Sequence, residues 1–160
     1  MKSDKKTDLS NFDLIELENF LNILGEKKFR AKQIFEWINK KNIRDFDAMT
    51  NISQDLRQKL KNKSYLNQID IIKKIDCDDL SSKFLLNLDD LNIIESVLIK
   101  YSYGNTVCVS SQVGCKMGCK FCASTVNGFI RNLNIAEMCW QVYLINQIQK
   151  ISNIVIMGSG

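Results

Sequence analysis

The spacing of apolar residues changes near residue 64, and this change restricts the chain to a mixed α/β fold. Residues 10–63 repeat apolar side chains three or four positions apart, which is the period of an amphipathic helix. The later segments show the shorter period and β-branched content of strands; they are 70–74, 83–88, 94–100, 105–110 and 153–157. We therefore expect a helical module followed by a β-rich region.

The first segment predicts three helices whose ends carry known signals. Ser10, with Asp13 three residues later, is a candidate N-cap pair for the first helix, and Gly25 lies where a C′ glycine would end it. A second helix is predicted over residues 29–41, and Ser53 can cap a third.

From residue 105 onward the predicted order is strand, long loop, helix and strand. Asn134 and Glu137 form a candidate capping box for the helix. Its apolar face is expected to contain Ile135, Met138, Val142, Ile145 and Ile148. One such βαβ unit implies a parallel strand pair but cannot cover both faces of a sheet. Because the chain stops at Gly160, just past the carboxyl end of the second strand, we expect the N-terminal part of a longer α/β barrel enzyme.

These patterns divide the chain into a helical domain (1–63), a β-strand region (64–104) and the start of a barrel domain (105–160). The net charge of +4 is confined to the first of these. Residues 1–63 carry 14 Lys and Arg against 10 Asp and Glu, whereas the remainder carries eight of each. On charge alone, a solvated basic surface and a nucleic-acid-binding surface are equally consistent with this balance.

No segment has the roughly 18–20 apolar residues of a membrane span, and the N-terminus lacks the apolar stretch of a secretory signal. The six cysteines are therefore expected to be reduced thiols of a cytoplasmic protein, rather than a disulfide framework.

Three of those cysteines, Cys115, Cys119 and Cys122, lie within eight residues in the run GCKMGCKFCAST. The spacing C-x3-C-x2-C can hold three corners of a four-iron cluster and leave the fourth iron without a protein ligand. Thiolates are the usual ligands of iron–sulfur clusters, and an open metal position is typical of a reactive site.

Two alternatives to the cluster are a zinc site and ordinary packing of the thiols. Structural zinc usually needs four ligands in pairs, but the chain has no histidine, and Cys77, Cys108 and Cys139 form no second pair. Buried packing fits poorly, because Lys116 and Lys120 make the segment polar. By contrast, Cys77 is expected to be a free thiol in a turn, and Cys139 a packing residue of a helix.

With Phe121 as the aromatic residue, the run resembles the C-x3-C-x-aromatic-C signature of the radical S-adenosylmethionine (SAM) superfamily. The resemblance implies a [4Fe–4S] cluster whose open iron chelates SAM. Electron transfer from the cluster then splits SAM to a 5′-deoxyadenosyl radical.

Longer stretches resemble one family, the dual-specificity 23S rRNA/tRNA adenine-C2 methyltransferases (the RlmN family). The similar stretches are GEKKFRAKQIFEWI with DFDAMTNIS, IIESVLIKY, CVSSQVGCKMGCKFCAST extended by GFIRNL, and NIVIMGSG. The resemblance implies an N-terminal RNA-binding module, the first βαβ unit of a partial (β/α) barrel, 23S rRNA and tRNA as substrates, an electron donor such as flavodoxin, and a monomeric state.

The same resemblance implies roles for individual residues. Cys115, Cys119 and Cys122 match the cluster ligands, and Gly160 matches the first residue of a SAM-contacting Gly-Glu pair. Cys108 matches the cysteine that resolves the protein–RNA adduct, with formation of a disulfide, and Glu95 matches the proposed proton acceptor. Most of the barrel is expected to be missing, together with the second catalytic cysteine, which carries the methyl group.

Three interpretations of function therefore remain open. The chain is expected to be the N-terminal part of the C2 methyltransferase, inactive in isolation. The first alternative is the relative that methylates adenine C8 of rRNA. The second is an inactive remnant that only binds RNA or a cluster. Considered without the resemblance, Cys108 would be a buried strand thiol, and Glu95 a solvent-facing carboxylate.

Overall fold

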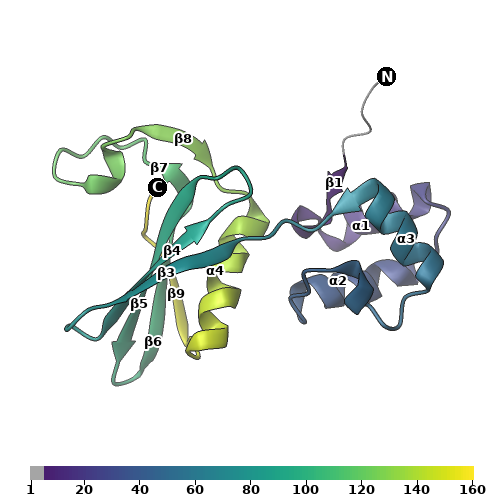
Figure 1. The fold of residues 1–160 in the computed structure, drawn as a ribbon, viewed down its shortest axis with the longest axis horizontal. Helices are drawn as coiled ribbons and strands as arrows, with labels where there is room; N and C mark the ends of the chain where they lie inside the picture. Colours follow the sequence, from purple (N-terminus) through teal and green to yellow (C-terminus); the bar gives the residue numbers. More distant parts are fainter. Residues whose placement is uncertain (1–5) are drawn as a thin grey trace. The chain divides into compact units, whose positions relative to one another are not determined.

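The structure, a computed structural model, describes residues 6–160. The chain divides between Asn67 and Gln68 into two compact units (Figure 1). The first unit is helical, and the second is built on a β-sheet. The division expected at residue 104 falls inside the second unit, because the strands on either side of it are hydrogen-bonded neighbours in one sheet. None of the helices within residues 6–160 has the length and apolar content needed to cross a bilayer.

The helical unit packs α1 (Leu14–Ile23), α2 (Phe29–Asn39) and α3 (Gln54–Lys63) around one apolar core. Short 3-10 helices cover Leu9–Asn11 and Phe46–Ala48, and the two-residue strands β1 (Thr7–Asp8) and β2 (Ser64–Tyr65) pair in parallel. Each α-helix buries residues three or four positions apart, as its sequence predicts; they are Leu17 and Leu21, then Ala31, Ile34 and Ile38, then Leu56 and Leu60.

The ends of α1 confirm one predicted signal and correct the other. Asp13, rather than Ser10, is the N-cap: its carboxylate accepts the Glu16 N–H at 2.7 Å, while the Glu16 carboxylate accepts the Asp13 N–H at 2.9 Å. Ser10 belongs to the preceding 3-10 helix, and its hydroxyl accepts the Asn67 N–H at 2.9 Å. Gly25 does end the helix, in the left-handed conformation (φ +76°) that favours glycine.

The sheet of the second unit has the order β3-β4-β5-β6-β9. β3 (Asp70–Asp76), β4 (Ser81–Asn87), β5 (Ile93–Tyr101) and β6 (Gly104–Val109) form an antiparallel meander. The chain then continues through α4 (Ile135–Ile148) to β9 (Asn153–Ile156), which pairs in parallel with β6. The predicted βαβ unit is thus confirmed.

α4 covers one face of this sheet (Figure 1). The capping box of Asn134 and Glu137 is confirmed, but the predicted buried face of the helix is wrong in part. Ile135 and Ile148 are exposed, whereas the buried residues are Ala136, Glu137, Trp140, Gln141, Leu144 and Ile145. Apolar residues occur nearly all around this helix, so their spacing could not select the face that packs on the sheet.

A short hairpin between β6 and α4 was not predicted from the sequence. It consists of β7 (Gln112–Gly114) and β8 (Phe129–Asn132), which pair antiparallel. The long connection between β6 and α4 therefore has a structured base, and the cysteine run lies in the loop that this hairpin closes (Figure 1).

The N-cap of α1 provides a test of the fold. Replacing Asp13 with Ala removes the acceptor for an otherwise unsatisfied backbone N–H and should lower the free energy of unfolding by about 1 kcal/mol. Asp13→Asn, which keeps a capping oxygen, should stay close to the parent chain. Urea unfolding followed by circular dichroism measures both, and equal stability of the Ala and Asn variants would contradict the assignment.

Candidate functional site

The candidate site is built around the loop that joins β7 to β8 and carries Cys115, Cys119 and Cys122. At its base the Cys115 N–H donates to the carbonyl of Gly128. Gly114 (φ +71°) lies so close to Gly128 that a Cβ atom at Gly114 would overlap that same carbonyl oxygen. The two strands can therefore approach this closely only because residue 114 is glycine.

Backbone and hydroxyl groups hold the turns inside the loop. The Cys122 N–H donates to the Cys119 carbonyl at 3.0 Å, and the Thr125 hydroxyl lies 3.1 Å from the Cys119 carbonyl and 2.9 Å from the Cys122 carbonyl. The Met117 N–H lies 3.5 Å from the sulfur of Cys115, and Gly118 supplies a left-handed turn (φ +65°). These contacts form local turns around all three cysteines.

The three thiols differ in exposure from the residues between them. All three cysteines are free and half-buried, whereas Met117 and Phe121 are 74% and 93% exposed. Over residues 6–160, no group of three or more His, Cys, Asp or Glu side chains stands close enough together to hold a metal ion. The three predicted ligands thus lie on one loop and are similarly half-buried, but their sulfur atoms are not close enough together to bind one metal ion.

The donor set nevertheless fits an iron–sulfur cluster. Three reduced thiols lie on one short loop, next to backbone N–H groups of the kind that hydrogen-bond to cluster sulfur. The loop is exposed and free of disulfides, since all six cysteines of the chain are free.

The segment that leads into β7, ahead of the loop, is anchored by Gln141 of α4. Its side-chain oxygen accepts the Ser110 N–H at 2.9 Å and the Ser96 hydroxyl at 2.8 Å. Its NH2 group donates to the Ser110 carbonyl at 3.0 Å and to the Glu137 carbonyl at 3.2 Å. Because Gln141 and Ser110 are fully buried, this complete set of partners offsets the cost of removing their polar groups from water.

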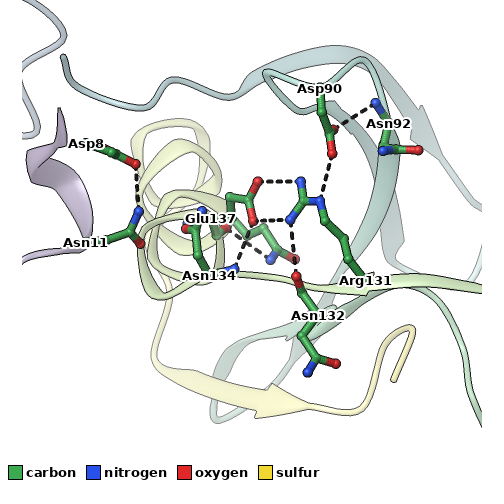
Figure 2. Close-up of polar contacts among 9 residues, drawn as sticks. Asp8, Asn11, Asp90, Asn92, Arg131, Asn132, Asn134 and Glu137 are labelled. Carbon is green, nitrogen blue, oxygen red and sulfur yellow. Dashed lines mark hydrogen bonds and ion pairs between the residues drawn. The ribbon is translucent and has the colours of Figure 1, made fainter. Parts of the chain in front are cut away.

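The chain that leaves the loop is anchored by Arg131 of β8, as Figure 2 shows. Its two terminal nitrogens donate to the two carboxylate oxygens of Glu137, each at 2.8 Å, and its Nε donates to Asp90 at 2.7 Å. Glu137 is only 2% exposed, and one of its oxygens also accepts the Asn134 N–H at 2.9 Å. A buried carboxylate is stable in this position because a bidentate guanidinium and a backbone donor both satisfy it.

The charges of this cluster perturb the pKa values of its members. Hydrogen bonding to the Arg131 guanidinium lowers the pKa of Asp90 to about 2, although partial burial opposes the shift. The pKa of Arg131 is raised, chiefly by its hydrogen bonds to Glu137. Both groups are therefore charged at neutral pH.

Glu95 and Cys108, the other two predicted site residues, share the sheet face opposite α4. Cys108 of β6 is directly opposite Val97 of β5, and Glu95 lies two positions along β5 from Val97. Directly opposed residues share a face, and so do alternate residues of one strand. Cys108 is half-buried, and the Glu95 carboxylate pairs with the Lys83 ammonium at 3.1 Å. This pair is half-exposed, so it contributes little to stability.

A cavity of about 460 Å³ lies between this end of the sheet and the base of the cysteine loop. Its lining includes Lys83, Glu95, Gly114, Ser124 and Ser159. The cavity therefore brings the predicted proton acceptor next to the cysteine loop.

Gly160, the predicted SAM-contacting residue, ends a glycine-containing turn that is tied to the same region. The Ser159 carbonyl accepts the N–H groups of Ser111 and Gln112, each at 2.9 Å, and the Ser159 N–H donates to the Ser110 hydroxyl at 3.0 Å. A Cβ atom on Gly160 (φ +125°) would overlap the Ser111 hydroxyl. The residues after β9 thus lie directly against those that enter the cysteine loop.

Sequence reasoning missed the residues that anchor the loop. Glu137 was predicted only as a helix cap, and Arg131 and Gln141 were not singled out. A usable signal exists: Glu137 and Gln141 occupy the same helical stripe as Trp140 and Leu144, the stripe that packs on the sheet. Polar residues inside a buried stripe indicate specific partners.

Several known proteins are similar to this chain. Residues 7–66 match the family described as the ribosomal RNA large subunit methyltransferase N-terminal domain. Two proteins named probable dual-specificity RNA methyltransferase RlmN are similar to the chain. The one from Lachnoclostridium phytofermentans is 48% identical over 159 residues, which are 98% of this chain and 45% of that protein. The one from Caldanaerobacter subterraneus subsp. tengcongensis is 52% identical over 154 residues, covering 95% and 45%.

A solved structure is similar over the same extent. The crystal structure of a radical SAM methyltransferase from Sphaerobacter thermophilus matches with a TM-score of 0.80 and 36% sequence identity, covering 96% of this chain and 47% of that one. The chain therefore spans a little less than half the length of the proteins that it matches.

The shifted pKa of Asp90 predicts a pH dependence. Because this pKa falls from near 3.9 in the unfolded chain to about 2, the contribution of Asp90 to stability is complete above about pH 4 and is lost as the pH falls toward 2. The stability difference between the parent chain and Asp90→Asn should therefore shrink over that range.

Urea unfolding midpoints measured from pH 2 to pH 6 would detect this change. Asp78→Asn, at an exposed turn position, serves as the matched control. A difference between the parent chain and Asp90→Asn that stays constant from pH 6 to pH 2 would contradict the prediction.

Proposed function

We propose that this chain, which corresponds to the N-terminal portion of the RlmN family of dual-specificity RNA methyltransferases, supplies the RNA-binding and cluster-binding parts of a radical SAM enzyme. The full enzyme would methylate adenine C2 in 23S rRNA and tRNA in the cytoplasm and would take electrons from a donor such as flavodoxin. The observation that carries the proposal is the three-cysteine loop, which adjoins a cavity that also contains Glu95. We further propose that β6, α4 and β9 are the first unit of a partial (β/α) barrel.

Cys115, Cys119 and Cys122 would hold the cluster. A [4Fe–4S] cluster with one open iron would bind SAM and supply the electron that cleaves it. The protein's contribution is to present three thiols on an anchored loop and to leave the adjoining cavity open to a second molecule. The turn ending at Gly160 would contribute to the SAM site, because it packs against Ser111 and Gln112 at the start of the same loop.

Glu95 and Cys108 would act on the RNA adduct. A carbon radical added to adenine C2 would give an adduct that must afterwards lose a proton and one electron, the electron passing to a redox partner of the same class as the donor, and then its thioether link to the protein. Glu95 lines the cavity and, as a carboxylate, can accept that proton. Cys108, on the same face of the sheet, would provide the thiolate that attacks the sulfur of the second, methyl-carrying cysteine. The disulfide would form as the thioether S–C bond breaks, and the released carbon would take up a proton to become the methyl group of the product.

The helical unit would bind the RNA. It carries the excess positive charge of the chain, and several cations lie on α2 or beside it; they include Lys27, Lys28, Arg30, Lys32, Lys40 and Lys41. Lys41 lies over the Trp37 ring at 3.4 Å, and the indole N–H donates to Asn51 at 2.6 Å. Trp37 is thus held in place by its own contacts and is better suited to shape this surface than to stack on bases.

Anaerobic reconstitution tests the cluster assignment. Supplied with iron and sulfide, the chain should bind one [4Fe–4S] cluster, detected by iron and sulfide content and by electron paramagnetic resonance of the reduced form. Cys119→Ala should lose most of the bound iron because only two thiolates remain. Cys77→Ala, at an exposed turn, is the matched control and should load normally. Full iron content in Cys119→Ala would refute the assignment, and so would binding of tetrahedral zinc by the parent chain instead of the cluster.

RNA binding by the helical unit should depend on salt. Each phosphate neutralised contributes about −0.7 to −0.9 to the slope of log affinity against log salt concentration. The triple variant Lys27→Ala, Lys28→Ala, Arg30→Ala should bind more weakly and show a shallower slope. Filter binding of a structured rRNA fragment between low and high salt measures both, and an affinity that does not change with salt would argue against an electrostatic site.

The role of Cys108 can be tested in a protein of the length of its relatives. Cys108→Ala should still add to adenine but should trap the covalent protein–RNA adduct, because no thiolate remains to release it. Denaturing gels with labelled RNA would detect the trapped species, with Cys139→Ala as a control that releases normally. Turnover of Cys108→Ala at the parent rate would eliminate this role.

A further inference from the structure

One helix, α4, is bonded to the chain on both sides of the cysteine loop: to Ser110 just before β7 and to Arg131 within β8. Glu137 and Gln141 are four residues apart on α4, so they lie on the same side of the helix. Gln141 bonds both backbone groups of Ser110, which precedes β7. Glu137 pairs with Arg131 of β8, which follows the loop.

We propose that Arg131, Glu137 and Gln141 are positioning residues that fix the β7–β8 hairpin, and with it the cysteine loop, against α4 and the sheet, and thereby let the three loop cysteines converge on one cluster. This inference rests on the proposed function, since it assigns a purpose to residues around the same site. None of the three residues is proposed to touch the cluster, SAM or RNA.

The chemistry of the contacts supports positioning rather than simple packing. A helix that only had to cover the sheet would use apolar residues throughout its buried stripe, as it does at Trp140 and Leu144. Buried charges and amides cost desolvation, and well-packed apolar replacements are often equally stable. Hydrogen bonds give what apolar packing does not, namely a defined direction and register for the two backbone segments that they join.

The Arg131–Glu137 pair is directional in this sense. Two parallel N–H donors meet two carboxylate oxygens at equal distances of 2.8 Å, a geometry that a planar guanidinium forms and an ammonium does not. The third contact, from Nε to Asp90, links the same side chain to the turn between β4 and β5. Arg131 therefore fixes the β8 end of the loop to two separate elements of the unit.

Alkylation of the thiols in the iron-free chain tests the proposal without any cofactor. The labelling rate of each cysteine is followed by peptide mass spectrometry in the parent chain and in Arg131→Lys, Arg131→Gln and Glu137→Gln. The last variant keeps a side chain that can complete the capping box, so it removes the charge of the pair and not the helix cap. Lys74→Gln, which breaks an exposed ion pair within β3, is the matched control.

The six cysteines provide internal references for this measurement. Cys77 is already exposed, so its rate reports intrinsic reactivity, and half-buried Cys139 reports the integrity of α4. We expect Cys115, Cys119 and Cys122 to react about fivefold faster or more in the Arg131 and Glu137 variants, because local opening of the loop becomes easier, while Cys77 and Cys139 keep their parent rates.

Two outcomes would overturn the proposal. Unchanged rates at the three loop cysteines would show that the ion pair does not restrain the loop. An equal increase at Cys139 would show that the pair stabilises the whole unit instead of positioning the loop. Arg131→Lys keeps the positive charge beside Glu137 and loses only the bidentate geometry. It can therefore be measured even if Arg131→Gln fails to fold.

Iron loading of the same variants separates this inference from the proposed function. Arg131→Lys, with all three thiols intact, should load less cluster than the parent chain or show an altered electron paramagnetic resonance spectrum. If the parent chain takes up no cluster, the proposed function is refuted. If the labelling rates of the loop cysteines still depend on Arg131 in that case, the restraint of the loop by the Arg131–Glu137 pair is established independently of the cluster. Full loading with a parent-like spectrum in Arg131→Lys would overturn the positioning role.

Discussion

The rest of the site depends on the ion pair between the buried carboxylate of Glu137 and Arg131. The carboxylate caps the helix that covers the sheet, and it also neutralises the arginine that ends the cysteine loop. Helix start and loop position are therefore coupled through one side chain that is almost entirely shielded from water. Such a group is stable only while all its partners are present, so any rearrangement that displaced Arg131 would leave an unpaired buried charge next to the first turn of α4.

The two faces of the sheet carry different kinds of chemistry. The face under α4 combines an apolar core with the fully satisfied amide of Gln141. The opposite face carries Cys108, Glu95 and Lys83 among half-buried apolar residues. β9 continues this face at the edge of the sheet with half-buried Val155, which lies directly opposite Cys108.

The sequence predicted the elements of the fold well and the contacts between distant elements poorly. Helix ends at Gly25 and Asn134 follow from local signals, because capping depends on neighbouring residues. The parallel pairing of β6 with β9 is the exception among distant contacts, because the order strand, helix, strand implies it. The buried side of α4 could not be predicted, since its apolar residues surround the helix. The bidentate pairing of Arg131 was equally hidden, because it depends on how a hairpin with only three or four residues in each strand folds back onto that helix. The three cysteines were identifiable by spacing alone, whereas their half-buried, ungathered arrangement was not.

The close approach of Gly114 and Gly128 closes the cysteine loop tightly at its base. Loop closure entropy rises slowly with length, by about 0.6 kcal/mol for each doubling, so residues added within the loop would cost little while its base stays closed. A side chain at position 114 would instead force the two strands apart at this base. Related sequences should therefore tolerate insertions between the last cysteine and Gly128 far more readily than any replacement of Gly114. The size of the loop can vary under selection, while the point where it closes cannot.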